Sequence, residues 1–161
     1  MITKTVAELM TENPLVVRKE TPLNEAIQIL VNRKVSGLPV VDAEMNLVGV
    51  ISEGDLTWQE TGVDTPPYIM LLDSVIYLQN PAKHDREIHK ALGQTVGEVM
   101  TEKVVSIASN KMVRDAAHLM HEKRVGRLPV LDFETGKLVG IITQGDIIRA
   151  MAQAAEPTHI Q

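Results

Sequence analysis

The chain contains one sequence pattern twice, and this duplication constrains its fold more than any other feature. The segment TVAELMT, which begins at Thr5, returns as TVGEVMT at Thr95. The segment VSGLPVVD…LVGVISEGD, which ends at Asp55, returns as VGRLPVLD…LVGIITQGD, which ends at Asp146. One extra residue near Gly136 adjusts the spacing in the second copy. A duplicated half-module predicts pseudo-twofold packing, with any ligand site present in two versions.

Both copies predict the same order of short elements. Each opens with a helix that has a Thr-x-x-Glu capping box and ends at Met10 or Met100. A short strand follows, and then an amphipathic helix with apolar residues at helical spacing. In the first copy, Thr21-Pro22 is expected to start that helix as its N-cap and first helical residue. A β-hairpin and a last helix, starting at Ser52 or Thr143, complete each copy.

The expected strands lie at 15–17, 38–41 and 47–52 in the first copy and at 104–107, 128–131 and 138–143 in the second. The predicted fold class is therefore mixed α/β, with two tandem β-α-β-β-α repeats in pseudo-twofold packing. We divide the sequence into repeat 1 at 1–58, a helical insert at 59–93, repeat 2 at 94–155 and a C-terminal tail at 156–161. The insert has no duplicate, and its apolar run Tyr68–Leu78 predicts burial against the repeats or a second subunit.

Composition excludes several classes of function. A net charge of −5 argues against electrostatic binding to nucleic acid. The absence of cysteine rules out disulfides, thiolate catalysis and cysteine-based zinc sites, and it fits a reducing compartment. The N-terminus lacks the pattern of a signal peptide, and no apolar stretch is long enough to cross a bilayer. We therefore expect a cytoplasmic protein with no membrane or nucleic-acid partner.

The strongest local motif is a hydroxyl residue at a strand end, followed three positions later by aspartate. It occurs as Ser52-Glu-Gly-Asp55 and as Thr143-Gln-Gly-Asp146. At a helix start, free N–H groups and the helix dipole favour an anion such as phosphate, and the carboxylate can accept ribose hydroxyls. The same spacing is also a capping box, which needs no ligand. Both interpretations remain open for each copy, although the shared flanking sequence favours the ligand.

These motifs resemble those of the CBS domain, and two of them in tandem resemble a CBS pair, or Bateman module. The resemblance covers both repeats but neither the insert nor the tail. It implies binding of an adenosine-containing ligand (AMP, ADP, ATP or S-adenosylmethionine) in clefts between the repeats. It also implies a homodimer, because the family commonly forms disc-like dimers. A regulatory module that senses adenine nucleotides, and hence energy state, is the function that follows.

The resemblance assigns roles to the matching residues. Asp55 and Asp146 would bind ribose hydroxyls, with Ser52 and Thr143 at the ribose–phosphate end. The residues expected to flank the base are Val50, Ile141, Leu15 and Val105. The residues expected to give backbone contacts are Ser36, Gly37, Gly126 and Arg127.

The two predicted sites differ in charge. Arg127 stands where the first copy has Gly37, and Arg149 stands where it has Trp58. Arginine offers a planar set of donors that matches phosphate oxygens, although many surface arginines are simply solvated. We therefore expect the second site to be better suited to a phosphorylated ligand.

Other functions have weaker support. His118 and His121 stand three residues apart on a helix, and His84 and His89 lie in the charged helix of the insert, but no further ligand stands at a metal-binding spacing. A metal-dependent hydrolase is the least favoured alternative, because the sequence shows no catalytic motif. We expect a non-enzymatic sensor without a cofactor, which signals ligand occupancy to an unidentified partner protein. The main alternative is a CBS pair without a ligand that acts only in dimerisation or protein docking.

Overall fold

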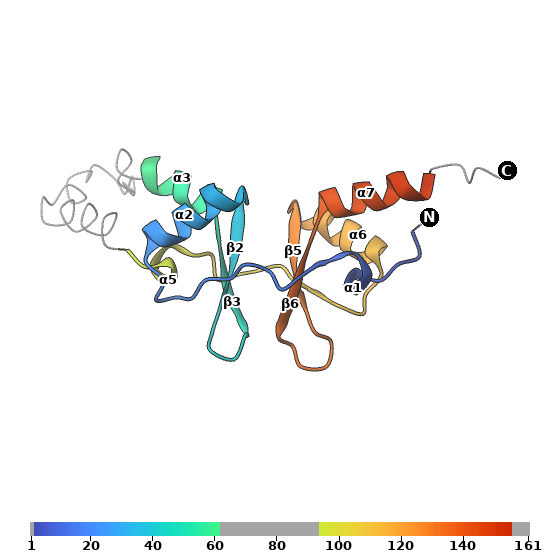
Figure 1. Cartoon of the computed structure of the whole chain (residues 1–161), viewed down its shortest axis with the longest axis horizontal. Coiled ribbons are helices and arrows are strands. Elements are labelled where there is room, and N and C mark those ends of the chain that lie inside the picture. The colour runs from blue at the N-terminus through green and yellow to red at the C-terminus, as the bar shows by residue number, and fades with distance from the viewer. Residues whose placement is uncertain (1, 62–93, 156–161) are drawn as a thin grey trace, which may run out of the picture. The chain divides into compact units, whose positions relative to one another are not determined.

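The computed structural model describes residues 2–61 and 94–155 (Figure 1). Most of the insert, including its apolar run, and the C-terminal tail lie outside the described residues. The chain forms two compact units. Unit 1 comprises Met1–Leu15, Val41–Leu47 and Lys103–Gln161, and unit 2 comprises Val16–Val40 and Val48–Glu102. The units therefore do not coincide with the sequence repeats, whose four-segment division remains a description of the sequence.

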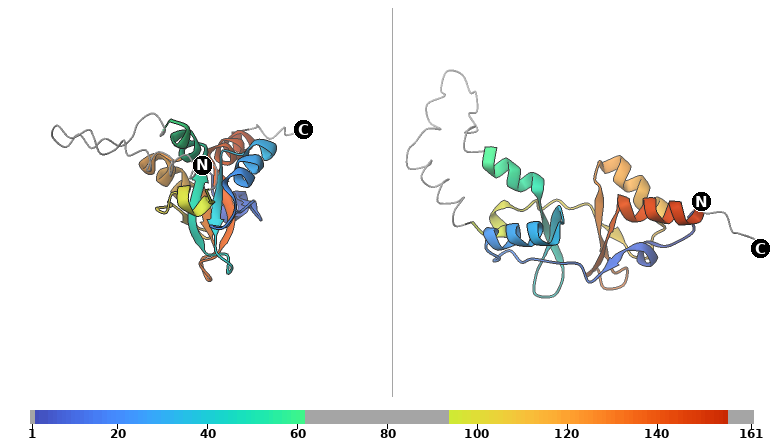
Figure 2. Two further views of the ribbon diagram at one scale, coloured as in Figure 1. Left: turned by 90° about the vertical axis from the view of Figure 1, so that its left-hand side faces the viewer. Right: turned by 45° about the horizontal axis from the view of Figure 1, so that its top comes forward.

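Unit 1 is built from strands and helices of both repeats. Its elements are α1 (Val6–Leu9), β1 (Thr11–Glu12), β4 (Ile107–Ala108), α6 (Val113–Lys123), β5 (Arg127–Leu131), β6 (Leu138–Thr143) and α7 (Gln144–Ala155). Its sheet has the order β1-β6-β5-β4, in which β6 runs antiparallel to β1 and β5 while β4 runs parallel to β5. Helices α6 and α7 pack together against β5 and β6 (Figures 1 and 2).

The core of unit 1 follows from the helical spacing of apolar residues. Val113, Ala116 and Met120 are buried on one face of α6, as their spacing predicts. They pack with the inward-facing residues Leu128 and Ile142 of the hairpin. An aliphatic core of this kind requires no large aromatic side chain.

Unit 2 repeats this arrangement with fewer paired residues. Its elements are α2 (Leu23–Arg33), β2 (Gly37–Val41), β3 (Leu47–Ser52), α3 (Glu53–Thr61) and α5 (Val96–Val99). Val17 pairs in parallel with Val40, and Val50 pairs antiparallel with Thr101, which matches the strand order of unit 1. The expected strands at 15–17 and 104–107 are shorter than predicted, because only their last residues reach a strand partner.

Thr21 does not cap α2 as the sequence predicted. Its hydroxyl instead accepts a hydrogen bond from the backbone N–H of Arg18, at 3.0 Å. The helix begins at Leu23, one residue beyond Pro22. The hydroxyl is used in the turn before the helix and is not available to the first helical N–H groups.

The short opening helices are exchanged between the repeats. Val6 of α1 is fully buried in the core of unit 1, and its N–H donates to the carbonyl of Lys111 at 2.8 Å. Val96 of α5 is fully buried in the core of unit 2, and its N–H donates to the carbonyl of Thr21 at 2.9 Å. Figure 1 shows α1 beside α6 and α5 beside α2. Each opening helix thus completes the unit that contains the hairpin of the other repeat.

A glycine in each hairpin makes room for the exchanged segment. A Cβ at Gly140 would lie 2.5 Å from the sulfur of Met10 and 2.9 Å from the carbonyl oxygen of Thr11. A Cβ at Gly49 would lie 2.6 Å from the sulfur of Met100 and 3.0 Å from the carbonyl oxygen of Thr101. The Met-Thr pair at the end of each opening helix therefore packs closely against the glycine of a Leu-Val-Gly sequence in a hairpin.

Two exposed carboxylates accept hydrogen bonds from backbone N–H groups. The carboxylate of Glu8 accepts from the N–H and the hydroxyl of Thr5, and these bonds lower its pKa. The carboxylate of Asp132 accepts from the N–H groups of Thr135 and Glu134 in the second hairpin turn, which lowers its pKa. The capping box and the turn predicted at these positions are confirmed.

Candidate ligand-binding site

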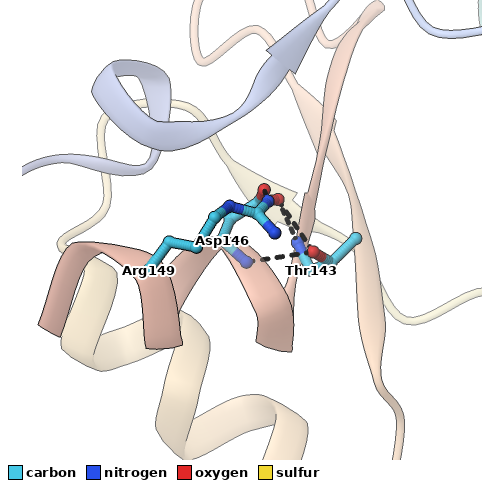
Figure 3. Close-up of polar contacts among 3 residues, drawn as sticks. All are labelled: Thr143, Asp146 and Arg149. Atoms are coloured by element: carbon cyan, nitrogen blue, oxygen red, sulfur yellow. Dashed lines mark hydrogen bonds and ion pairs between the residues drawn. The ribbon is translucent and has the colours of Figure 1, made fainter. Parts of the chain in front are cut away.

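The Thr143-x-x-Asp146 motif of unit 1 forms at the junction of β6 and α7. The Oδ2 atom of Asp146 accepts hydrogen bonds from the N–H of Thr143 at 2.8 Å and from its hydroxyl at 2.9 Å (Figure 3). In return, the Thr143 hydroxyl oxygen accepts from the N–H of Asp146 at 3.2 Å. The capping box is therefore present, and it uses one carboxylate oxygen of Asp146.

The other carboxylate oxygen of Asp146 is held by an arginine from the next turn of α7. Arg149 forms an ion pair and hydrogen bond with Oδ1 (Figure 3). The Arg149 side chain is 69% exposed, whereas that of Asp146 is 11% exposed. The guanidinium lies close to Gly145, where a Cβ would be 3.3 Å from one of its nitrogens. Glycine at this position leaves the first turn of α7 open to the arginine.

The corresponding motif in unit 2 has the same cap but a different second partner. The Oδ2 atom of Asp55 accepts from the N–H of Ser52 at 2.9 Å and from its hydroxyl at 3.0 Å. Its Oδ1 atom accepts from the hydroxyl of Thr101 at 2.8 Å. The two motifs are therefore equivalent in backbone and cap, but a neutral hydroxyl replaces the guanidinium.

Strand register brings further predicted residues to the unit 1 motif. Arg127 lies opposite Thr143 in the β5–β6 ladder, so their side chains share one face of the sheet. Ile141 is on the same face, two residues before Thr143. The carbonyl of Gly126 accepts the N–H of Gln144 at 2.9 Å, which ties the start of β5 to the start of α7. In the described part of the chain, the Arg127 guanidinium has no hydrogen bond or ion pair.

The remaining predicted site residues are less directly connected to the two aspartate motifs. In unit 2, the carbonyl of Ser36 accepts the N–H of Glu53 at 3.0 Å, and the neighbouring Gly37 is buried at the start of β2. Val50 lies beside Thr101. Leu15 is 42% exposed and Val105 packs on the unit 1 core, with no hydrogen bond joining either to the described Asp146 motif.

Sequence reasoning missed Thr101 as a partner of Asp55. Thr101 is distant in sequence and belongs to the exchanged segment, so spacing within one copy could not indicate it. A signal was present nonetheless, because both copies have threonine after the opening helix, at Thr11 and Thr101. Thr11 lies opposite Ile141 in the β1–β6 pairing, which places it at the equivalent position in unit 1.

The described residues offer neither a metal-binding cluster nor a membrane-spanning helix. No group of three or more histidine, cysteine, aspartate or glutamate side chains in residues 2–61 and 94–155 is arranged to hold a metal ion. Within those ranges, no helix is both long enough and apolar enough to span a bilayer.

Comparison with protein families identifies the class of protein. The family model of the CBS domain matches residues 6–58 and 96–153, which together make up more than half of the chain. The chain belongs to the CBS domain family, and its two matched segments form a CBS pair. The predicted mixed α/β fold of tandem CBS repeats is confirmed, while the helical insert lies outside the described residues.

Two known proteins match most of this chain. The chain is 35% identical over 159 residues to the CBS domain-containing protein CBSX2, chloroplastic, of Arabidopsis thaliana. That match covers 96% of this chain but 66% of the relative, so the chain spans slightly less than two thirds of that protein. It is 33% identical over 147 residues to protein MJ1426 of Methanocaldococcus jannaschii, with 87% of each chain covered.

A solved structure of CBSX2 in complex with AMP shares the fold. Its TM-score is 0.73 at 34% sequence identity, and the match covers 93% of this chain and 97% of that chain. The ligand in that complex belongs to the adenosine class that the resemblance to the CBS family implies.

Proposed function

We propose that this CBS pair is a regulatory module that binds an adenosine nucleotide at the Asp146 motif of unit 1. The observation that carries the proposal is that one oxygen of a mostly covered carboxylate holds the cap while the other faces an exposed, displaceable partner. The complex of the similar protein CBSX2 with AMP supports the choice of ligand class. AMP, ADP, ATP and S-adenosylmethionine all present the ribose that this carboxylate would bind.

The unit 1 residues supply complementary chemistry for such a ligand. The Oδ1 atom of Asp146 would accept a ribose hydroxyl in a charge-assisted hydrogen bond. The Arg127 guanidinium, unpaired among the described residues and opposite Thr143, would attract the phosphate. Ile141 offers an apolar surface on the same face of the sheet. Asp55 and Ser52 would form the second site in unit 2, with fewer charged partners.

The proposed role is regulatory and non-enzymatic. The module would act in the cytoplasm and report ligand occupancy to an unidentified partner protein. A ligand can do this only if it binds one conformation more tightly than another, because that difference sets how far the population shifts. No cofactor is required for such a role.

Replacing Asp146 by alanine is expected to weaken AMP binding by on the order of 1.5–3 kcal/mol, the usual cost of losing hydrogen bonds to a charged acceptor. Titration calorimetry on the full chain measures the effect. The matched control is Asp115→Ala, because Asp115 caps α6 by accepting the N–H of Met112 at 3.0 Å and lies outside the site. The control should lose helix stability to a similar degree but keep its AMP affinity. Equal AMP affinity in both variants would contradict the assignment.

A homodimer is the second part of the proposal, and it is also the basis of the alternative role as a docking module. Helices α6 and α7 form an apolar groove of about 490 Å³, whose lining includes Val113, Ala117, Ile147 and Met151. Met151 is 53% exposed there, and the nearby Ile148 of α7 is also largely exposed. An exposed apolar surface of this kind favours cover by a second copy of the chain.

Met151→Glu is therefore expected to convert the dimer to a folded monomer, because it places a charge in an interface that excludes water. Light scattering gives the mass, and circular dichroism establishes that the variant is folded. Glu98→Gln, a charge change on an exposed residue of α5 in unit 2, is the control and should leave the mass unchanged. A Met151→Glu variant that keeps the dimer mass would place the interface elsewhere. A wild-type chain that is monomeric would refute the homodimer itself.

A further inference from the structure

The two copies of the motif differ in what occupies the free carboxylate oxygen. In unit 2 the occupant is the neutral hydroxyl of Thr101, and in unit 1 it is the charged guanidinium of Arg149. Thr11 occupies the place of Thr101 in unit 1, yet Oδ1 of Asp146 is held by Arg149. The cap therefore forms in both units, whether the second partner of the aspartate is a hydroxyl or an arginine.

We propose that Arg149 makes the unit 1 site discriminate against ligands that lack a phosphate. The inference rests on the proposed function and adds a mechanism of selectivity to it. In the empty site, Arg149 neutralises Asp146. A ligand that takes Oδ1 of Asp146 for its ribose must displace the guanidinium and leave it without an anion. A phosphate on the ligand supplies a new anion, whereas a bare nucleoside does not.

The geometry allows this exchange of partners. Arg149 is largely exposed, so its pair with Asp146 is a weak surface ion pair that a ligand can break. Its guanidinium lies over Gly145 and the first turn of α7, beside Thr143, where the phosphate end of the ligand is expected. The dipole of this twelve-residue helix favours a phosphate at the same point. Arg149 can thus remain near the helix start while it changes from carboxylate to phosphate.

Removing the charge of Arg149 is expected to have opposite effects on the affinities for adenosine and AMP. With Arg149 replaced by glutamine, adenosine no longer competes with an ion pair, and its affinity should rise by about 2- to 5-fold. AMP loses a charge-assisted contact, and its affinity should fall by about 10-fold. A variant that is merely less well folded cannot bind adenosine more tightly, so this gain separates selectivity from a structural role.

The experiment is titration calorimetry with AMP and with adenosine on the full chain carrying Asp55→Asn, which weakens the unit 2 site so that unit 1 dominates the heat. Arg149→Gln is added to this parent and compared with Lys111→Gln, which removes one exposed positive charge elsewhere in unit 1. Arg149→Lys tests for rescue and should restore part of the preference for AMP.

The expected result is a reduced preference for AMP over adenosine in Arg149→Gln alone. An unchanged preference, or an equal loss for both ligands, would overturn the inference and leave the proposed function standing. A parent chain that binds neither ligand, together with a wild-type chain that also fails to bind AMP, would overturn the proposed function and the inference with it.

Discussion

Val6→Asp is expected to unfold unit 1 before unit 2. Helix α2 and the β2–β3 hairpin of unit 2 should keep their structure longer, although they follow Val6 in the sequence. Val6 is fully buried among Val113, Met120 and other core residues of the second repeat. A buried carboxylate there has no cation to pair with among its core neighbours, all of them apolar. The expected loss is about 3–5 kcal/mol, which is a large part of the stability of a small domain.

Hydrogen exchange locates the damage. Protection should be lost first at residues 107–147, although the substitution lies near the N-terminus. Val96→Asp should produce the mirror result, with loss at residues 17–51, because Val96 is buried in the core of unit 2. Val31→Asp, on the exposed face of α2, is the control and should change little, since Val31 is 67% exposed. Loss of protection confined to residues 17–51 in Val6→Asp would contradict the exchange of opening helices.

Gly140→Val is expected to destabilise unit 1 by about 1–3 kcal/mol, the usual cost of overpacking. A loss of stability is informative here, because replacing glycine by valine normally stabilises a strand. Here the new Cβ would lie 2.5 Å from the sulfur of Met10 and 2.9 Å from the backbone oxygen of Thr11. The methionine can move aside, but the strand carrying Thr11 must shift away from β6.

Urea denaturation measures this cost, and a double-mutant cycle traces it to the contact. Gly140→Val should cost less in a Met10→Ala background, because the shorter side chain removes the closest clash. Gly54→Ala is the control, since its Cβ would meet only the hydroxyl oxygen of Ser52, at 3.6 Å. A Gly140→Val chain as stable as wild type would show that β1 does not pack against β6 as closely as described.

The regular elements could be predicted because local chemistry determines them. The strand Leu138–Thr143 has the expected bounds, since burial alternates along it and Asp132 and Gly136 form the preceding turn. The amphipathic stripe of α6 likewise follows from spacing alone. The prediction of the start of α2 was wrong because the Thr21 hydroxyl can accept a hydrogen bond either from the helix start or from the preceding turn. Only the folded turn selects between them.

The exchange of opening helices could not be predicted from the same information. Thr5–Met10 and Thr95–Met100 have nearly the same sequence, so either helix satisfies the apolar requirements of either hairpin. The choice depends on chain connection and on packing at Gly49 and Gly140, which are long-range effects. The candidate site shows the same limit. Its cap could be predicted from a four-residue motif, whereas Thr101 joins Asp55 only through the exchanged segment.

The exchanged helices also set an order for folding during protein synthesis. Val6 is synthesised well before the second repeat, but its binding place in unit 1 exists only after Ile142 has been made. Closing so long a loop costs little extra free energy, because the entropic cost grows only with the logarithm of loop length. It does slow folding, since distant contacts must form together. The apolar surface that Val96 covers in unit 2 therefore stays exposed on the nascent first repeat until the second repeat has been synthesised.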